Sequence, residues 1–325
     1  MKDKIKFGVS LYSFTNEFYE YTYTFEQCLE KIAEIGGEGF EMVASQSIPE
    51  YPYPSDEFVD YLKGLCDKYG LEPVSYGAYI DKGLRSDREL TEKEIISSTL
   101  WDIQYAAKMG FHVMRTQHLI SPAILEKIIP YAEAYDVKVG PEMHAPHTFE
   151  TPVIKRFLEL FSKCGSSHIG LIPDFGMAQE RPGKLYIDSQ VLNGAHEEII
   201  KFISDSNEKK VPKDETAAKV KEMGGNGVDM EQVDAIYSRF APFDLKAFKE
   251  AMPYVIYFHG KFYYMDEQDR DPGMPYKEVY TIVKDSGFEG WINSEYEGHG
   301  MTASHTVSAE EMVRRHQRML RKVIG

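Results

Sequence analysis

Strand-like and helix-like segments alternate along this 325-residue chain, and this alternation restricts the fold more than any other feature. Short apolar runs are followed by turns and then by stretches with apolar residues at helical spacing. Capping boxes at Thr24–Gln27 and Thr91–Glu94 mark two helix starts. Eight strands separated by helices are typical of an α/β protein with a (β/α)8 TIM barrel, here one domain over residues 1–325. The expected strands are residues 6–14, 39–43, 72–80, 111–117, 137–142, 169–174, 254–263 and 290–296.

A doubly wound parallel sheet shows the same alternation and is the structural alternative. Such a sheet normally has a glycine-rich loop after its first strand, where a nucleotide phosphate binds. The corresponding segment here, residues 13–19, reads SFTNEFY and contains no glycine. We therefore expect the barrel.

One stretch interrupts the alternation, namely the long insertion between strands 6 and 7 at residues 178–252. A plain connection of this kind is far shorter. Residues 206–223 are rich in lysine and glutamate, four residues of Gly-Gly-Asn-Gly follow, and residues 229–239 look helical. We expect the insertion to act as a lid or a subunit interface. The alternative is a solvent-exposed insertion without a functional role.

The last four expected strands, from residue 137 onward, each lead to a side chain of a type that binds metal ions: Glu142, Asp174, His259 and Glu295. In a parallel barrel, side chains at the C-terminal strand ends converge on one mouth. Three carboxylates and an imidazole suit a divalent ion such as Mn²⁺ or Mg²⁺. A single strand-end acid would more simply form a structural salt bridge, but four at matching positions predict a shared metal site and therefore an enzyme.

Two histidines follow the first of these acids directly. His144 lies two residues after Glu142 and should share its inward face, which makes His144 the expected proton acceptor near neutral pH. His147 would be a substrate contact or the alternative base. A structural role in the loop is the competing interpretation for each histidine.

Four further residues are candidates for contacts with substrate. Strand alternation places Lys261 on the same face as His259, so its ammonium could contact a substrate oxygen or orient a metal-bound carboxylate. Arg115 and His118 lie at the end of the fourth expected strand and could bind substrate. Tyr12 lies late in the first strand, where an aromatic residue can equally belong to the core.

Composition excludes some classes of partner. With 37 basic and 52 acidic residues the formal net charge is −15, which argues against a nucleic-acid partner. No run approaches the roughly 20 apolar residues of a membrane span. The N-terminal residues lead into a strand without the apolar region of a signal peptide, so we expect a cytoplasmic location. The three cysteines form no zinc or disulfide pattern.

The early segment 7–14 (FGVSLYSF), the ordered set of four metal-binding side chains and the His259-Gly260-Lys261 element together resemble the xylose isomerase-like barrel family of isomerases, epimerases and related enzymes. The resemblance extends over nearly the whole chain. It implies a divalent-metal site but no particular reaction, because the family also includes dehydratases and lyases. In the epimerases the metal-binding histidine follows the aspartate closely, whereas Asp174 and His259 are 85 positions apart here.

These departures are similar to the catalytic alpha subunit of bacterial C-glycoside deglycosidases. That resemblance implies Mn²⁺, or alternatively Mg²⁺ or Co²⁺, on the four ligands, and a catalytic histidine in the segment 142–147. It also implies a small β-sandwich beta subunit as partner in a hetero-oligomer. The expected reaction is cleavage of the carbon–carbon bond of a flavonoid-type 3-oxo-C-glucoside by enolisation and β-elimination. The alternative is a metal-dependent sugar isomerase or epimerase, which would share the metal and the first proton transfer.

Overall fold

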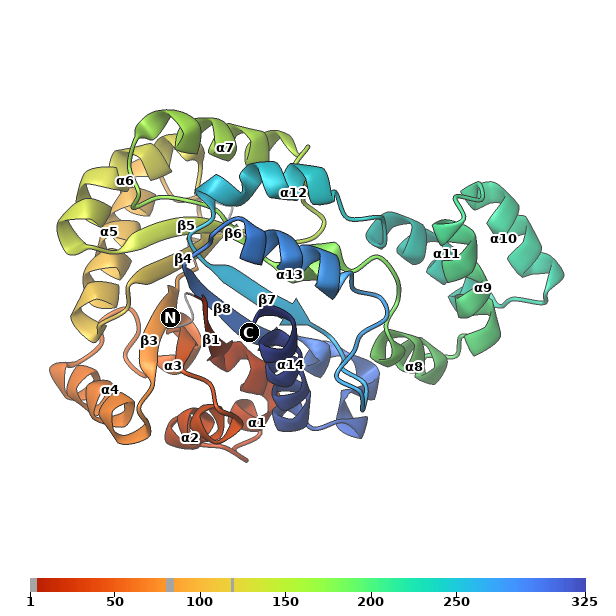
Figure 1. Ribbon diagram of the computed structural model, residues 1–325, viewed down its shortest axis with the longest axis horizontal. Helices are drawn as coiled ribbons and strands as arrows, with labels where there is room; N and C mark the ends of the chain where they lie inside the picture. Colours follow the sequence, from red (N-terminus) through yellow and green to blue (C-terminus); the bar gives the residue numbers. More distant parts are fainter. Residues whose placement is uncertain (1–4, 80–84, 118–119) are drawn as a thin grey trace.

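Eight parallel strands form the centre of the computed structural model, which describes residues 5–79, 85–117 and 120–325. Their order around the sheet is β6-β5-β4-β3-β2-β1-β8-β7. Parallel bridges from Leu171 to Val255 and from Asp174 to His259 link the two ends, so the strands form a nearly closed barrel (Figure 1). The predicted (β/α)8 fold is confirmed. The strands are β1 (Ile5–Ser10), β2 (Gly39–Val43), β3 (Glu72–Gly77), β4 (Val113–Gln117), β5 (Lys138–Met143), β6 (Ile172–Pro173), β7 (Phe258–Phe262) and β8 (Gly290–Tyr296).

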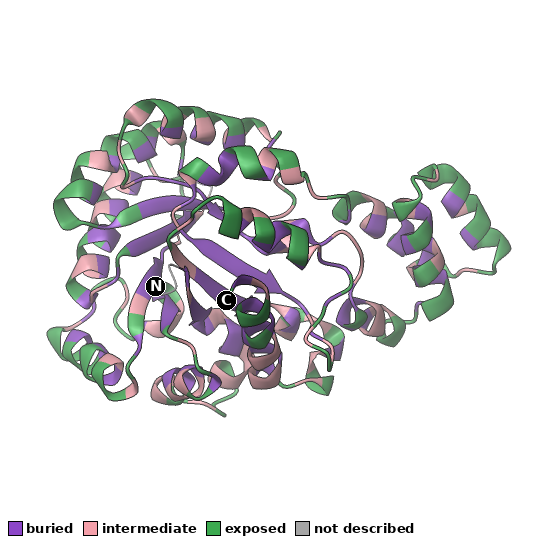
Figure 2. Cartoon of the chain, viewed as in Figure 1, coloured by how far each residue is buried: buried purple, intermediate pink, exposed green. Residues whose placement is uncertain are grey.

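Helices surround the barrel, and most of those that pack against it turn a buried face to the strands and an exposed face to solvent (Figure 2). The predicted capping boxes at Thr24–Gln27 and Thr91–Glu94 are both present. Gly36 and Gly110 end the same two helices at φ 89° and 90°, a backbone region that favours glycine. The helices are α1 (Thr15–Tyr19), α2 (Phe25–Ile35), α3 (Ala44–Ser47), α4 (Asp56–Tyr69), α5 (Glu92–Met109), α6 (Pro122–Tyr135), α7 (Pro152–Cys164), α8 (Lys184–Leu192), α9 (Glu197–Glu208), α10 (Lys213–Glu222), α11 (Gly227–Arg239), α12 (Leu245–Ala251), α13 (Tyr276–Asp285) and α14 (Ala309–Ile324).

Some strand boundaries differ from the sequence prediction. The first strand ends at Ser10, and residues 11–14, predicted to continue it, form the 3-10 helix η1 (Leu11–Phe14). The Ser10 hydroxyl accepts a hydrogen bond from the Tyr12 N–H at 3.4 Å and so caps this helix. Strand β6 has only two residues, since Pro173 lacks an N–H and the chain turns into η2 (Phe175–Ala178) directly after Asp174.

The insertion between β6 and β7 folds into the helices α8 to α12, and α9, α10 and α11 extend to one side of the barrel (Figure 1). The predicted helix at residues 229–239 is present as α11, whereas α8, α9 and α10 were not foreseen individually. The insertion has a hydrophobic core separate from that of the barrel. Its buried members are Tyr186, Ala195, Ile199, Ile200, Ile203, Val220, Val233, Ile236 and Phe240.

The buried carboxylate of Asp229 joins the starts of α9 and α11. It accepts hydrogen bonds from the backbone N–H of His196 at 2.7 Å and of Asn226 at 2.9 Å, and from His196 Nδ1 at 2.7 Å. The Asn226 side chain in turn accepts from the Asp229 N–H, which completes a capping box. One side chain therefore holds two helix ends of the insertion together.

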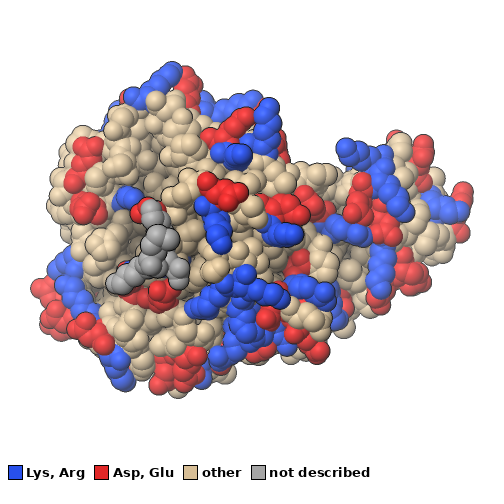
Figure 3. All heavy atoms as spheres, in the orientation of Figure 1, with Lys and Arg blue, Asp and Glu red and all other residues tan. Residues whose placement is uncertain are grey.

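Charged side chains of both signs are mixed over most of the face shown in Figure 3, and basic ones gather over α14. Several of these arginines are already paired, Arg314 with Glu310 and Arg315 with Glu311. With five basic and two acidic residues, α14 still keeps a net positive charge. Within the described ranges, no helix combines the length and apolar character that crossing a membrane requires.

We predict that Asp229→Ala loosens the insertion and leaves the barrel intact. Two backbone N–H groups at the helix starts would lose their acceptor, and loss of such a cap costs about 0.5–2 kcal/mol in helix stability. Hydrogen exchange measured by mass spectrometry should become faster in α9 and α11 and stay unchanged in the barrel strands. Asp234→Ala is the matched control on α11, because that carboxylate is mostly exposed. Equal exchange in the two variants would contradict the prediction.

Candidate metal centre and active-site cavity

The four predicted metal ligands converge at the C-terminal end of the barrel. Glu142 comes from β5, Asp174 follows β6, His259 lies in β7 and Glu295 in β8, and all four are buried. One ligand atom from each lies within 4.8 Å of all the others. Strand register explains the convergence, because Asp174 is opposite His259 and Lys261 is opposite Glu295. Among the described residues, this buried cluster could bind a divalent metal ion.

The ring of His259 is held by a carboxylate that sequence reasoning missed. Nε2 lies 2.8 Å from Oε2 of Glu41 in β2, and because a carboxylate can only accept, Nε2 carries the hydrogen. When a metal ion displaces the second ring proton, the ring presents its lone pair from Nδ1. That atom lies 3.0 Å from Glu142 Oε1 and 3.1 Å from Glu295 Oε2. A carboxylate behind a histidine ligand is a common way of fixing its tautomer.

The carboxylates present one oxygen to the cluster and have the other held elsewhere. Arg115 Nη1 donates to Glu142 Oε2 at 2.8 Å, which leaves Oε1 facing His259. The Gly176 N–H donates to Asp174 Oδ1 at 2.7 Å, which leaves Oδ2 inside the cluster. A Cβ at Gly176 would come within 2.8 Å of the Lys261 side chain, so glycine is required for this close approach. The free oxygens are thereby oriented before any ligand arrives.

The electrostatics of the cluster favour a cation at its centre. Burial opposes a charged imidazole, yet Glu295, Glu41 and Glu142 raise the pKa of His259 well above its ordinary value. Burial alone would raise the pKa of Glu142, but Arg115 and His259 lower it well below its ordinary value. Burial raises the pKa of Asp174 to about 6, with Lys261 acting in the opposite direction.

The donor set therefore fits a metal ion. Nδ1 of His259 is buried, makes no hydrogen bond to any residue that the structure describes, and lies within 3.1 Å of carboxylate oxygens of Glu142 and Glu295. A lone pair that faces three carboxylates is repelled unless a proton or a metal ion lies between them. A divalent ion bound by Glu142, Asp174, His259 and Glu295 would supply that positive charge.

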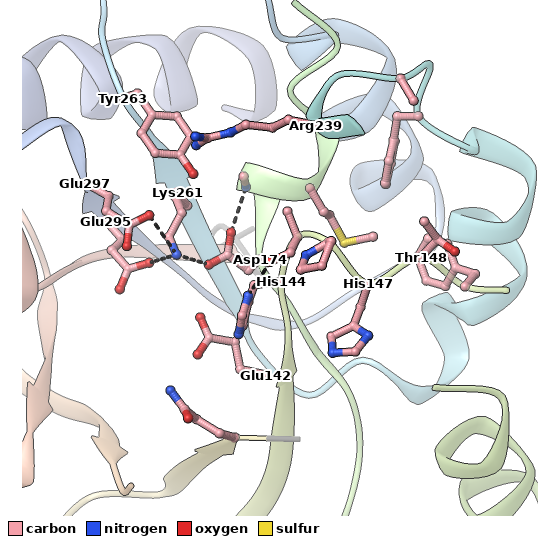
Figure 4. A pocket seen from close by; sticks show the side chains of 18 of the residues that line it. Glu142, His144, His147, Thr148, Asp174, Arg239, Lys261, Tyr263, Glu295 and Glu297 are labelled. Atoms are coloured by element: carbon pink, nitrogen blue, oxygen red, sulfur yellow. Dashed lines mark hydrogen bonds and ion pairs between the residues drawn. The ribbon is translucent and has the colours of Figure 1, made fainter. Parts of the chain in front are cut away.

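Lys261 lies beside the cluster and binds its acids (Figure 4). Its ammonium is 2.7 Å from Asp174 Oδ2 and 3.3 Å from both Glu295 Oε2 and Glu297 Oε2. Of the two roles predicted for Lys261, these contacts fit the orientation of metal-binding carboxylates. The same side chain also lines the cavity, so a contact with substrate stays a prediction.

The two predicted catalytic histidines lie on the loop after β5, at the opposite side of the cavity from Glu297 (Figure 4). His144 Nδ1 is 2.7 Å from the Ala145 carbonyl oxygen, which can only accept, so Nδ1 carries the hydrogen and Nε2 keeps the lone pair. The ring of His147 lies 6.3 Å from that of His144. Burial and the neighbouring His144 lower the pKa of His147, so it is neutral at neutral pH.

A cavity of about 940 Å³ opens above the cluster. This volume is near the upper end of the range of roughly 300–1,000 Å³ for small-molecule sites. Tyr12, Tyr79, Phe149 and Tyr263 give it aromatic walls. The last residues of α11 and the segment after it, residues 238–239 and 241–244, form part of the wall as well. The insertion therefore contributes directly to the cavity.

The predicted substrate contacts have different positions. Tyr12 lines the cavity, and burial raises its pKa to about 12, which keeps its hydroxyl protonated. Arg115 is fully buried behind Glu142, pairs with Glu41 and Glu142, and is not among the lining residues. Its position fits a support of the metal ligands better than the predicted contact with substrate. His118 lies outside the described residues.

Sequence reasoning missed Glu41, Glu297 and Arg239. Glu41 is an acid inside the apolar segment Phe40–Val43, which is the same signal that identified the four ligands, although it lies in the first half of the chain. Glu297 follows the last strand by one residue and could have been found by its spacing from Glu295. Arg239 gave no signal, because its place in the cavity depends on how the insertion packs.

The chain belongs to the xylose isomerase-like TIM barrel family, whose model matches residues 29–323. It is also similar, over nearly its whole length, to curated deglycosidase alpha subunits. It is 30% identical to the 3'-dehydrocarminate deglycosidase alpha subunit of a Microbacterium species, over 98% of this chain and 95% of the relative. It is 29% identical to a C-glycoside deglycosidase alpha subunit of Arthrobacter globiformis, over 98% of this chain and 92% of the relative.

Solved structures show the same fold at lower identity. A D-psicose 3-epimerase in the presence of D-fructose superposes with a TM-score of 0.58 at 14% identity, covering 98% of this chain and 99% of its own. The IOLI protein with a bound zinc atom has a TM-score of 0.59 at 13% identity, with 98% of both chains covered. At such identities the likeness establishes the barrel and nothing about the reaction.

We predict that Glu41→Gln weakens metal binding without altering any of the four ligands. The amide still accepts from His259 but lacks the charge, and loss of such a supporting carboxylate typically costs about 10–100-fold in metal affinity. Calorimetric titration of the metal-free protein with Mn²⁺ would measure the change. Glu72→Gln, an exposed acid at the start of β3, is the control. An affinity for Mn²⁺ equal to that of the control would show that Glu41 does not support metal binding.

We also predict that Glu142→Gln and Glu295→Gln each lose bound metal. Each substitution replaces an anionic ligand by a weak neutral one, so metal content after dialysis should fall well below one ion per chain. Glu278→Gln on α13 should keep the wild-type content. Elemental analysis provides the measurement, and wild-type content in both ligand variants would show that the ligand set is wrong.

Proposed function

We propose that this chain is the catalytic alpha subunit of a heteromeric, metal-dependent carbon–carbon lyase. Its substrate would be a 3-oxo-C-glucoside with an aryl aglycone of flavonoid type. The observation that supports this best is the similarity to deglycosidase alpha subunits over 98% of the chain. In addition, one cavity is lined both by members of the cluster that could bind a metal ion and by His144. The finer assignment of reaction and substrate is the proposal.

The residues at the floor of the cavity suggest where the sugar lies. Glu142, Asp174, His259 and Glu295 would hold the divalent ion, with Mn²⁺ as the expected ion and Mg²⁺ or Co²⁺ also compatible with the ligand set. When bound, such an ion supplies Lewis acidity toward the oxygen of the sugar ketone and stabilises the negative charge of an enolate. Lys261 keeps Asp174 and Glu295 in place beneath the sugar.

His144 would take the proton from C2 of the sugar, next to the C3 ketone. Its Nε2 holds the lone pair, because Nδ1 donates to the Ala145 carbonyl. As the C2–H bond breaks, its electrons pass into the enolate. They then form the C1–C2 double bond while the bond from C1 to the aryl carbon breaks. The aryl carbon gains a proton in place of the one lost from C2, so the reaction needs no oxidant, reductant or water.

The proposed assembly includes a small beta subunit of β-sandwich fold. Support comes from the relatives, which are named as alpha subunits. The insertion at residues 178–252 would act as a lid or as part of the subunit interface. Its contribution to the cavity wall supports a position next to the substrate.

The function is tested by incubating the metal-loaded protein and its partner with a 3-oxo-C-glucoside and measuring free aglycone by chromatography. Release of aglycone is expected, and removal of the metal with a chelator should abolish it. Free ketohexoses serve as the parallel substrate. Absence of aglycone together with rapid epimerisation of a ketohexose would replace the proposal by the isomerase or epimerase alternative, which shares the enolisation step.

We predict that His144→Ala retains metal and loses turnover. Removal of a general base lowers kcat by roughly 10²–10⁴-fold, whereas the metal content should remain that of the wild type. His147→Ala should have a smaller effect on kcat. His112→Ala, an exposed histidine outside the cavity, is the control. Near-normal kcat in His144→Ala and a large loss in His147→Ala would transfer the role of base to His147.

A further inference from the structure

Arg239, the last residue of α11, extends from the insertion into the wall of the cavity. Its guanidinium lies 5.4 Å from the ring centre of Tyr263, 5.8 Å from Tyr186 and 5.7 Å from Phe240. Figure 4 shows the side chain directed toward Tyr263 at the edge of the site. These rings restrict the side chain without using its hydrogen-bond donors, because cation–π contacts engage the face of the guanidinium.

Arg239 differs from the other cation that lines the cavity. Lys261 is already neutralised by Asp174, Glu295 and Glu297. By contrast, no carboxylate, carbonyl or hydroxyl of the described chain forms an ion pair or hydrogen bond with the guanidinium of Arg239. A guanidinium has five N–H donors in a planar fork that matches a carboxylate. Arg239 is thus a restrained cation with its donors available toward the cavity.

The position of Arg239 indicates which part of a ligand it would meet. Glu142, Asp174, His259 and Glu295 are buried at the floor of the cavity. Arg239 is exposed and therefore lies toward the mouth of the cavity. The aromatic ring of Tyr263 lies beside it, and Phe243 lines the same cavity. A ligand with its sugar at the floor would place a flat aromatic portion between these walls, with its far edge at Arg239.

The other charged side chains of the cavity wall indicate what charge a ligand group at Arg239 would have. Asp244 and Glu297 also line the cavity, and both would repel an anionic ligand. An anion can therefore be accommodated near Arg239 better than elsewhere along the wall. A neutral ligand would gain little from an arginine whose aromatic contacts are already made.

We propose that Arg239 binds a carboxylate on the aromatic leaving portion of the substrate and so selects acidic aglycones. This inference rests on the proposed function, because it assigns the sugar to the floor of the cavity. The insertion would then supply a specificity-determining residue, while the barrel supplies the ligands and the base. Lysine should replace Arg239 only in part, since its single ammonium cannot bind both carboxylate oxygens in the same plane.

The test uses the full chain loaded with Mn²⁺ and co-purified with its partner subunit, and it measures binding separately from turnover. Calorimetry compares a hydroxyflavone carboxylic acid with its primary amide for the wild type, Arg239→Gln and Arg239→Lys. Loss of a charged, bidentate hydrogen bond should weaken binding of the acid by about 10–100-fold in Arg239→Gln. Arg239→Lys should be intermediate, and affinity for the amide should change less than about threefold.

Arg156→Gln is the matched control, because Arg156 is an exposed arginine on α7 outside the cavity. Unchanged affinity for the acid in Arg239→Gln would overturn the inference. Equal losses for the acid and the amide would also overturn it and would assign Arg239 to packing against Tyr263. Dissociation of the partner subunit with normal ligand affinity would assign Arg239 to the subunit interface instead.

Turnover of a 3-oxo-C-glucoside by the wild type separates this inference from the proposed function. Selective binding of the acid without release of aglycone would leave the carboxylate subsite standing and contradict the lyase assignment. Release of aglycone without discrimination between the acid and the amide would contradict the subsite alone.

Discussion

The burial of four carboxylates within one small volume is the constraint on which the rest of the site depends. Glu41, Glu142, Asp174 and Glu295 are all almost completely inaccessible to solvent. Burying an unpaired carboxylate is strongly unfavourable, so the barrel must place cations among them. Arg115, Lys261 and the imidazole of His259 meet this need in part. A divalent ion between Nδ1 of His259 and the facing oxygens of Glu142, Asp174 and Glu295 would balance the negative charge that is left.

The barrel and the insertion contribute different things to the cavity. Parallel strand register brings the ligands together from four neighbouring strands, and backbone hydrogen bonds fix their heights relative to one another. The insertion has a core of its own, so it can supply one wall without disturbing the strands. A rigid cluster at the floor and a separately folded wall at the mouth would let the wall vary without disturbing the cluster.

The sequence was sufficient for the fold and for the convergence of the four candidate ligands because both depend on local patterns. Alternation of strands and helices predicts the barrel, and a metal-binding side chain at a strand end is visible in the residue order. Contacts across the barrel are not visible in this way. Arg115 could be placed at the end of β4, but its pairing with Glu41 and Glu142 arises from the closure of the sheet. Arg239 enters the cavity through helix packing in the insertion, for which the local sequence has no equivalent signal. The first strand was predicted too long because its aromatic residues suit a strand as well as the 3-10 helix that they form.

The central claim is that Glu142, Asp174, His259 and Glu295 hold one divalent ion beside His144. A crystal structure of the Mn²⁺-loaded protein, with anomalous diffraction recorded for manganese, tests it most directly. The account predicts one anomalous peak per chain, bound by one oxygen of each acid and by Nδ1 of His259 at distances of roughly 2 Å. An absent peak, or a peak coordinated by other residues, would contradict it.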